Sequence, residues 1–211
     1  MTETEYQQPD QAVQNIETNT KIHRLTSTRK SVFDAFAYIN RLPEVPYEDE
    51  SSADFSGRIF GRLANQEGRI LLKSPPGMSN LAYEGFKTFI QYEGEQRVGN
   101  CVACHTLPDF TDDRSHSVQP GMEKVPTTSL RNLNKSSQSL REIIDQKIEY
   151  AKIKQKGGAP KISDAYSQIR LHHDDASGLV AFLKILRDVP EQTFRQLILD
   201  SEVFDPSGTP E

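Results

Sequence analysis

The sequence predicts an all-α fold, one compact unit of about five or six helices separated by long irregular loops. Two observations lead to this prediction. Apolar residues recur at spacings of three and four in several segments, which is the period of a helix that buries one face. The alternation of apolar and polar residues that is typical of strands is almost absent, while 12 glycines and 12 prolines supply turns between the segments. A chain of 211 residues is long enough to bury one such core.

Residues 1–30 are expected to form a disordered tail or linker. Gln, Thr, Asn and Glu dominate this stretch, so it cannot bury enough apolar area to offset the entropy of ordering. A secretory signal needs a basic start followed by about 7–15 apolar residues, and nothing before Ser31 supplies them. Two explanations stay open: the start is truncated or processed, or the chain is part of a longer polypeptide.

Three helices are predicted in the first half of the chain. The first begins at Ser31 and ends before Pro43 and Pro46, which cannot continue a helix. A weaker one covers residues 59–72, before the turn-forming run of residues 74–77. The strongest covers residues 81–90, where one face collects apolar or small residues, namely Leu81, Gly85, Phe86, Phe89 and Ile90.

Two helices are predicted near the end of the chain. Leu179, Phe182, Leu183 and Leu186 share one face of a helix that has Asp174 or Asp175 as its N-cap, and Pro190 lies beyond its end. Residues 191–203 then form a short helix packed on the outside, so that residues 191–211 are a C-terminal helix and tail.

Charge and hydropathy exclude two classes of partner. The net charge of -5 comes with no clustered basic face, so nucleic acid is not expected to bind. Mean hydropathy is -0.63, and the apolar runs are much shorter than the roughly 18 residues of a membrane-spanning helix. No membrane span is therefore expected in this chain.

The only two cysteines of the chain lie in the motif Cys101-Val102-Ala103-Cys104-His105. A pair of cysteines two residues apart, followed at once by histidine, is the spacing of covalent c-type haem attachment. Each thiol adds to one vinyl group of the porphyrin, while the adjacent imidazole binds the iron. The motif therefore predicts one covalent haem c, attached through Cys101 and Cys104, with His105 as the proximal iron ligand.

Other uses of the motif were weighed. Zinc would require more ligands, because adjacent Cys104 and His105 rarely chelate one ion together and there is no second cysteine pair. A thioredoxin-like dithiol would require a βαβ context. A chance occurrence in a reduced protein is a further alternative, which the flanking residues disfavour.

Three further segments agree in order with the motif: Pro126–Asn132, Ser139–Ile144 and Leu179–Leu186. Together with Cys101–Asp112 they resemble the haem domain of the bacterial dihaem cytochrome c peroxidases and their MauG-like relatives, over about residues 80–190. The resemblance implies a cytochrome c-like domain over residues 31–190, with its motif core at residues 80–190. It also implies that the helix with Gly85 and Phe89 crosses the helix with Phe182, with the glycine permitting close contact.

The chain departs from this family in three places. It has one attachment motif where the relatives hold two haems. The loop at residues 133–138 is short and lacks the family's aromatic-rich turn with a histidine. Lys147, with Tyr150 three residues on, stands where the relatives place a Met or Tyr as the second axial ligand.

The second axial ligand therefore has several candidates. Met122 is a possible distal ligand, and its thioether would raise the reduction potential; the alternative is that it fills a gap at the haem edge. Lys147 would bind as a neutral amine, although a helical lysine is usually a solvated charge. An open iron is a further possibility, and the remaining candidates are His116, His172 and His173, the last two being more typical of a surface or a cap.

The resemblance also gives Arg131 a role near the haem. Its guanidinium is expected to pair with a propionate, or alternatively to donate hydrogen bonds to loop carbonyls. Asp109, Thr111 and Asp112 are expected to shape the turn after the motif through local backbone bonds.

The function expected from these features is electron transfer by a c-type cytochrome with a redox partner protein or a fused redox domain. The alternative is a cytochrome c peroxidase-like enzyme that reduces hydrogen peroxide at an open iron. A module whose haem is vestigial is a third possibility. Attachment of haem to such cysteines implies a periplasmic or otherwise extracytoplasmic location.

Overall fold

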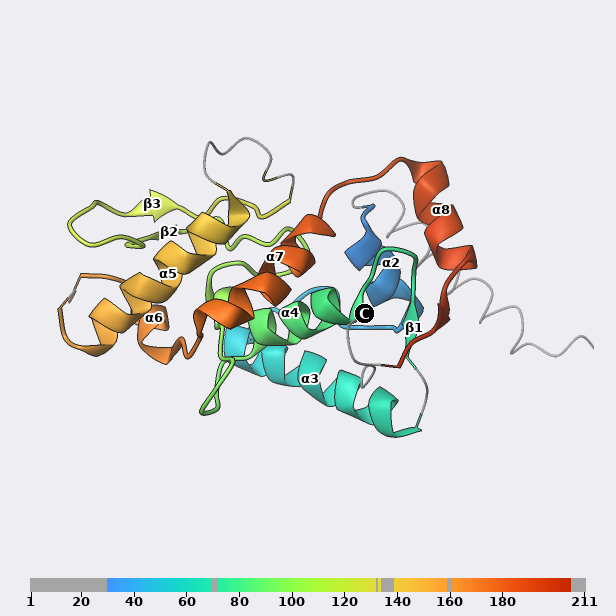
Figure 1. The fold of residues 1–211 in the computed structure, drawn as a ribbon, viewed down its shortest axis with the longest axis horizontal. Coiled ribbons are helices and arrows are strands. Elements are labelled where there is room, and N and C mark those ends of the chain that lie inside the picture. Colours follow the sequence, from blue (N-terminus) through green and yellow to red (C-terminus); the bar gives the residue numbers. More distant parts are fainter. Residues whose placement is uncertain (1–29, 70–71, 132, 134–138, 159–160, 206–211) are drawn as a thin grey trace, which may run out of the picture.

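The computed structural model describes residues 30–69, 72–131, 133, 139–158 and 161–205. Nearly all of the predicted tail, residues 1–29, lies outside the described residues, as do most of the predicted short loop and residues 206–211. The described part is mainly helical, as predicted, but it contains more α-helices than the five or six expected (Figure 1). They are α2 (Val32–Ile39), α3 (Ser52–Arg69), α4 (Asn80–Ile90), α5 (Leu140–Gln155), α6 (Ala165–Gln168), α7 (Ala176–Lys184) and α8 (Glu191–Leu199).

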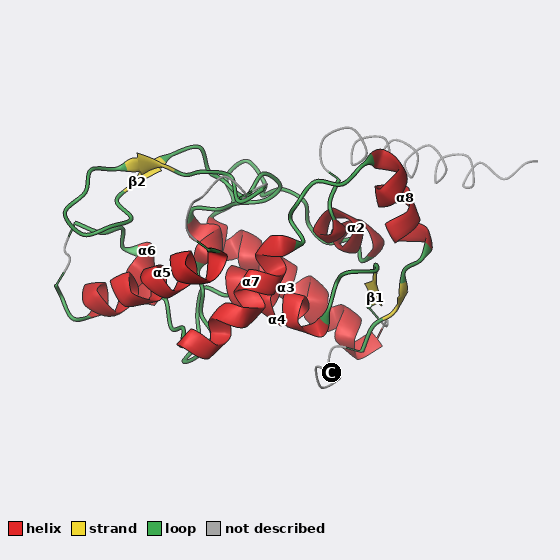
Figure 2. Ribbon diagram, turned by 45° about the horizontal axis from the view of Figure 1, so that its top comes forward, coloured by secondary structure: helices red, strands yellow, loops and turns green. Residues whose placement is uncertain are grey.

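Short elements complete the described fold. Two 3₁₀ turns are present, η1 (Cys101–Ala103) and η2 (His173–Asp175). Two antiparallel strand pairs are also present, each two residues long: β1 (Lys73–Ser74) with β4 (Glu202–Val203), and β2 (Ser115–His116) with β3 (Val125–Pro126). Figure 2 shows how little of the described chain these strands occupy beside the helices.

The helix boundaries follow local capping. Ser79 caps α4 by accepting a hydrogen bond from the Ala82 N–H at 3.2 Å. The sequence placed the start of α3 too late, because Ser51 accepts the Asp54 N–H at 3.1 Å and so opens the helix before the apolar pattern becomes clear.

The C-terminal predictions need three corrections. Asp175 is the N-cap residue of α7, as one of the two predicted choices, but its side chain makes no capping bond to that helix, because its carboxylate accepts the His172 N–H at 2.8 Å. Helix α7 ends at Lys184, before the predicted Leu186. Helix α8 ends at Leu199, since residues 202–203 leave the helix to pair with β1.

The central packing feature is the crossing of α4 and α7 (Figure 1). A Cβ atom at Gly85 would lie 1.9 Å from the carbonyl oxygen of Gly178, so only glycine fits there. The predicted close crossing of these two helices is confirmed. Leu81, predicted to face the core, is instead 42% exposed, and its neighbours Ala82 and Tyr83 are buried.

Aromatic rings fill the main core around this crossing. Phe86 and Phe89 from α4 meet Phe182 from α7, with ring centroids 5.3 and 5.1 Å apart. Phe33 of α2 packs edge-on against Phe86, and Phe110 of the loop after η1 lies 5.8 Å from Phe89. The core therefore links α2, α4 and α7 to the loop that follows the cysteine motif.

Two smaller apolar clusters flank the main core. One joins α5 to α6 through Ala151, Ile162 and Tyr166. The other packs Phe194 and Leu197 of α8 against α2, which confirms that the last helix lies on the outside.

Both ends of the described chain lie on the α2 and α8 side. The Val189 N–H donates to the Lys30 carbonyl at 2.6 Å, and the Phe204 N–H donates to the Leu72 carbonyl at 2.7 Å. In Figure 1 this side lies opposite the lobe formed by α5, α6, β2 and β3. Among the described helices, none is long and apolar enough to cross a membrane.

We expect Gly85→Ala to lower the free energy of unfolding by about 3 kcal/mol or more, because the added methyl group forces two helix backbones apart. Urea unfolding followed by circular dichroism measures the loss. The matched control is Gly61→Ala on α3, whose added Cβ meets nothing within 4 Å. It should raise stability by about 0.5–1 kcal/mol through helix propensity. Equal effects of the two substitutions would contradict the assigned role of the crossing.

Candidate functional site

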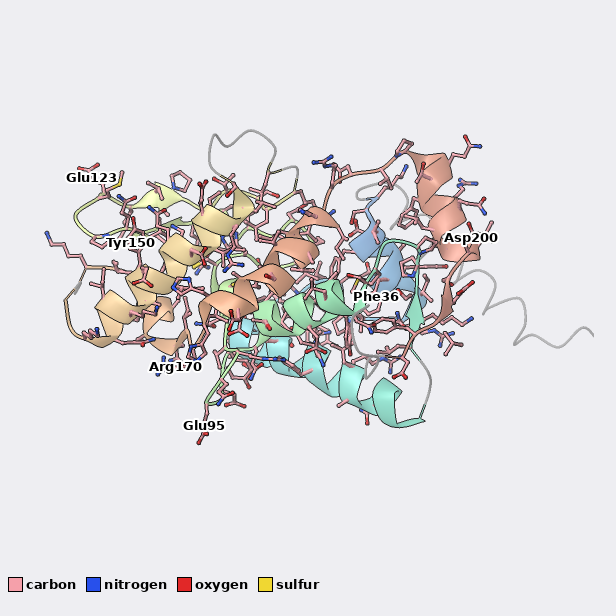
Figure 3. All side chains as sticks on the ribbon, in the orientation of Figure 1. Phe36, Glu95, Glu123, Tyr150, Arg170 and Asp200 are labelled. Atoms are coloured by element: carbon pink, nitrogen blue, oxygen red, sulfur yellow. The ribbon has the colours of Figure 1, made fainter. Side chains whose placement is uncertain are left out.

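The cysteine motif is fixed between α4 and α6. The Gly99 N–H donates to the Thr88 carbonyl at 3.0 Å, and a Cβ at Gly99 would lie 2.4 Å from that oxygen. Val98 and Arg170 exchange backbone hydrogen bonds of 3.2 and 2.8 Å, and Figure 3 labels Arg170 beside α6. Asn100, in the left-handed conformation, donates from its amide to the Ala165 carbonyl at 3.0 Å. These bonds set the position of η1, on which the motif begins.

The imidazole of His105 is held in one orientation. Its Nδ1 lies 3.0 Å from the carbonyl oxygen of Phe110. Because a carbonyl can only accept, this bond requires the proton on Nδ1 and leaves the lone pair on Nε2. Nε2 has no hydrogen-bond partner within the described part of the chain. Burial lowers the pKa of His105, so the ring favours the neutral form that binds metals.

The loop after the motif is braced by its own polar side chains. Thr106 Oγ1 donates to the Thr111 carbonyl at 2.8 Å, and the Thr111 N–H donates back to the Thr106 carbonyl at 3.2 Å. Thr111 Oγ1 accepts the Asp113 N–H, and Asp112 accepts the Arg114 N–H, both at 3.0 Å. The turn-shaping role predicted for Thr111 and Asp112 is confirmed, and these bonds fix the Phe110 carbonyl that orients His105.

Both cysteines are free thiols and are partly buried. Burial, with a smaller contribution from Cys104, raises the pKa of Cys101 to about 12. Burial and the charge of Asp112 raise the pKa of Cys104 to about 11. A reactive dithiol needs a lowered thiol pKa, so this environment disfavours the thioredoxin-like alternative. The described residues also contain no group of three His, Cys, Asp or Glu side chains placed to hold one metal ion, which leaves the zinc alternative without a ligand set.

Side chains from α5 and α6 lie close to the motif. Tyr166 of α6 is 8% exposed, and burial, with smaller contributions from the two cysteines, raises its pKa. The Tyr166 hydroxyl donates to the Val118 carbonyl at 3.3 Å. Lys147 of α5 is partly buried, and its charge contributes to lowering the pKa of His105. The motif thus lies between the main core and the α5–α6 cluster.

These surroundings fit a haem. Cys101, Val102 and Phe110 belong to or pack on the main core, while Tyr166 and Val118 belong to the separate α5–α6 cluster. Two apolar walls therefore flank two thiols and an imidazole with a free nitrogen, which is the donor set that haem attachment requires. The buried Ser117 Oγ, in the loop before Val118, has no hydrogen-bond partner among the described residues.

Asp112 and His116 form a hydrogen bond beside the motif. Asp112 Oδ2 and His116 Nε2 are 2.7 Å apart. Burial raises the pKa of Asp112, but the hydrogen bonds from His116 and the Arg114 N–H lower it below its ordinary value. Because Nε2 of His116 is engaged, the candidacy of His116 as an axial ligand receives no support.

Arg131 connects the loop to α2. Its Nη1 and Nη2 donate to the two Asp34 oxygens at 2.9 and 2.7 Å, and its Nε and Nη2 donate to the Pro108 carbonyl at 3.0 and 2.9 Å. Of its two predicted roles, the bond to a loop carbonyl is confirmed. The guanidinium makes its bidentate contact with the Asp34 carboxylate, where a haem propionate was predicted.

The remaining ligand candidates lie at the surface. Met122 is 52% exposed in the turn between β2 and β3. His172 is exposed, and His173, also exposed, bonds Asp145 and Glu149 at 2.8 and 3.2 Å. The surface role predicted for both histidines is confirmed, and Met122 faces solvent instead of filling a gap.

Sequence reasoning missed two residues that shape the site. Tyr166 and Asp34 have no motif or periodicity that sets them apart, and their partners lie far away along the chain. Only the folded chain brings them to the motif and its loop.

Comparison of the chain with protein-family models, with curated proteins and with solved structures gives no match.

We expect Arg131→Met to cost about 3–5 kcal/mol of unfolding free energy, because it leaves the Asp34 carboxylate buried without its counter-ion. The side chains of Arg131 and Asp34 are only 4% and 9% exposed. The control Arg195→Met breaks an ion pair whose side chains are 70% and 36% exposed, and it should cost less than about 1 kcal/mol. Chemical denaturation of both variants makes the comparison, and similar losses would refute the importance of the buried pair.

We expect the haem-free protein to react with iodoacetamide at pH 8 at least about tenfold more slowly than a peptide cysteine, because raised thiol pKa values leave little thiolate. Mass spectrometry of time points measures the rate. In denaturant the same thiols should react at the peptide rate. Fast alkylation of the folded protein would show that burial does not protect the motif.

Proposed function

We propose that this chain is a c-type cytochrome, a cytochrome c-like helical domain that binds one covalent haem and transfers electrons. The single observation that supports this most strongly is the state of His105. The Phe110 carbonyl fixes its Nδ1 proton, so the free Nε2 is available to iron beside two thiols at the attachment spacing.

Each residue of the motif has a distinct task in this proposal. Cys101 and Cys104 would hold the haem through thioether bonds, and His105 would bind the iron. The bound haem would supply a one-electron couple, in which ferric iron takes an electron from a reduced donor and ferrous iron gives it to an oxidised acceptor. The donor and acceptor would be redox partner proteins or a fused redox domain.

The surrounding residues prepare the site for this chemistry. The hydrogen bond from His105 to Phe110 makes the imidazole a stronger donor and prevents its rotation. The apolar residues of the main core and of the α5–α6 cluster limit the access of water to the partly buried motif, and solvent exposure is a principal control of reduction potential.

The resemblance to the dihaem peroxidase family over residues 80–190 supports the same assignment, and the confirmed crossing at Gly85 agrees with the helix pair that it implies. Covalent attachment of haem would take place in the periplasm or another extracytoplasmic compartment.

The test is expression together with haem-attachment machinery. We expect one haem per chain that stays attached in denaturant, measured by mass spectrometry and by the absorption of the pyridine haemochrome. Cys101→Ala and Cys104→Ala should each leave one thioether, and the double variant none, because each thiol makes one bond. His105→Ala should lose the iron ligand, whereas the exposed control His172→Ala should leave the spectrum unchanged.

A wild-type chain that carries no covalent haem under these conditions would overturn the proposal. Addition of hydrogen peroxide to the loaded protein decides between electron transfer and the peroxidase alternative. A spectrum indifferent to peroxide supports an electron carrier, whereas rapid turnover of peroxide with a reduced donor would make the chain an enzyme.

A further inference from the structure

A pocket of about 580 Å³ lies between α3 and the loop that joins α3 to α2. On the α3 side it is lined by Arg58, Arg62 and Asn65, which are four and three residues apart and so share one helix face. Loop residues between Arg41 and Tyr47 form the rest of the lining. Pockets of about 300–1,000 Å³ that combine apolar walls with a few polar groups are typical of small-molecule sites.

Arg58 fixes the loop against α3. Its Nε and Nη2 donate to the two carboxylate oxygens of Glu50 at 2.7 and 2.6 Å, and Nη2 also donates to the Val45 carbonyl at 2.9 Å. The guanidinium carbon lies 4.1 Å from the centroid of the Tyr47 ring. Tyr47 is nevertheless 68% exposed, so most of its ring is accessible to a ligand in the pocket.

Two residues of the lining go against local backbone preference. Arg41 has a left-handed backbone (φ 51°) just after the C-cap of α2, where glycine is the usual residue. Gly61 lies inside α3, where alanine would favour the helix more, and a Cβ there would meet nothing within 4 Å. Neither choice helps the fold, and such departures are expected at functional sites. Arg41 brings a cation to the pocket, and Gly61 keeps it open.

The charges of the lining favour an anion. Arg41 and Arg62 are exposed, and neither side chain makes a hydrogen bond or an ion pair with a described residue. Glu50 balances the charge of Arg58, and Glu44 is the one carboxylate in the lining, so one positive charge is left over. The chain as a whole has a net charge of -5, so this excess is local. Guanidinium groups bind phosphate and carboxylate through paired hydrogen bonds.

We propose that this pocket binds a small aromatic anion, a ring compound that carries a phosphate or another oxyanion group. The oxyanion lies between Arg41 and Arg62, and the ring lies on Tyr47 and the apolar loop residues beside it. None of the lining residues belongs to the cysteine motif or to the loop after it, so the inference does not depend on the proposed haem.

The experiment is a titration of the full chain, labelled with ¹⁵N, followed by the amide signals in two-dimensional NMR. Phenyl phosphate is the probe, with inorganic phosphate and phenol as its two halves. We expect phenyl phosphate to shift the signals of residues 41–47 and 58–65 to saturation. Each half should bind at least about tenfold more weakly, because phosphate lacks the stacking ring and phenol lacks the charge.

Three variants separate binding from folding. Arg41→Gly removes the cation and relieves the left-handed backbone, so it should raise the urea midpoint while weakening phenyl phosphate at least about tenfold. Gly61→Leu keeps every charge and fills the pocket, so it should weaken binding without lowering the midpoint. The control Arg195→Gln removes an exposed arginine of α8 that does not line the pocket, and it should bind as wild type does.

Several results would overturn the proposal. Shifts that do not saturate, or that spread beyond the pocket, would show that no site exists there. Inorganic phosphate binding as tightly as phenyl phosphate would remove the role of the ring, and phenol binding as tightly would remove the role of the arginines. Unchanged affinity in Arg41→Gly or in Gly61→Leu would place the ligand elsewhere. All these results are independent of whether the chain carries haem.

Discussion

The contact between the backbones of α4 and α7 at Gly85 and Gly178 is the constraint on which the rest of the structure depends. A side chain at Gly85 would overlap a carbonyl oxygen, and the absence of one lets Phe86, Phe89 and Phe182 form a single aromatic core. Helix α4 then delivers the chain to Gly99, where a second close backbone contact sets the start of the cysteine motif. The contact at Gly85 lies on α4, and the contact at Gly99 lies on the segment that follows α4. The position of the motif therefore depends on how closely α4 approaches α7.

The features that the sequence predicted well are those determined by residues near one another in the chain. Helices α2, α4 and α7 were found because their apolar periodicity is local. The start of α3 was missed because a cap at Ser51 precedes any apolar pattern. The pairing of β4 with β1 was missed because the two strands lie far apart in the sequence, and because a strand of two residues shows no alternating pattern.

The residues of the candidate site also fall into a local and a distant group. The thiols, His105 and the turn-forming Thr111 belong to one short segment, so their side-chain types and most of the loop's hydrogen bonds could be predicted from the sequence. The bond between Arg131 and Asp34 spans 97 positions, and the bond from the Asn100 amide to the Ala165 carbonyl spans 65. Burial, which raises the thiol pKa values and lowers that of His105, is a property of the packed interior and cannot be deduced from the motif.

The two ends of the described chain lie beside α2 and α8, while α5 and α6 project from the opposite side (Figure 1). Lys30 is bonded to Val189, which precedes α8, and Phe204 is bonded to Leu72, which precedes β1. In the proposed cytochrome, a partner protein that docks against α5 or α6 would therefore approach the side of the molecule opposite to Lys30 and Asp205.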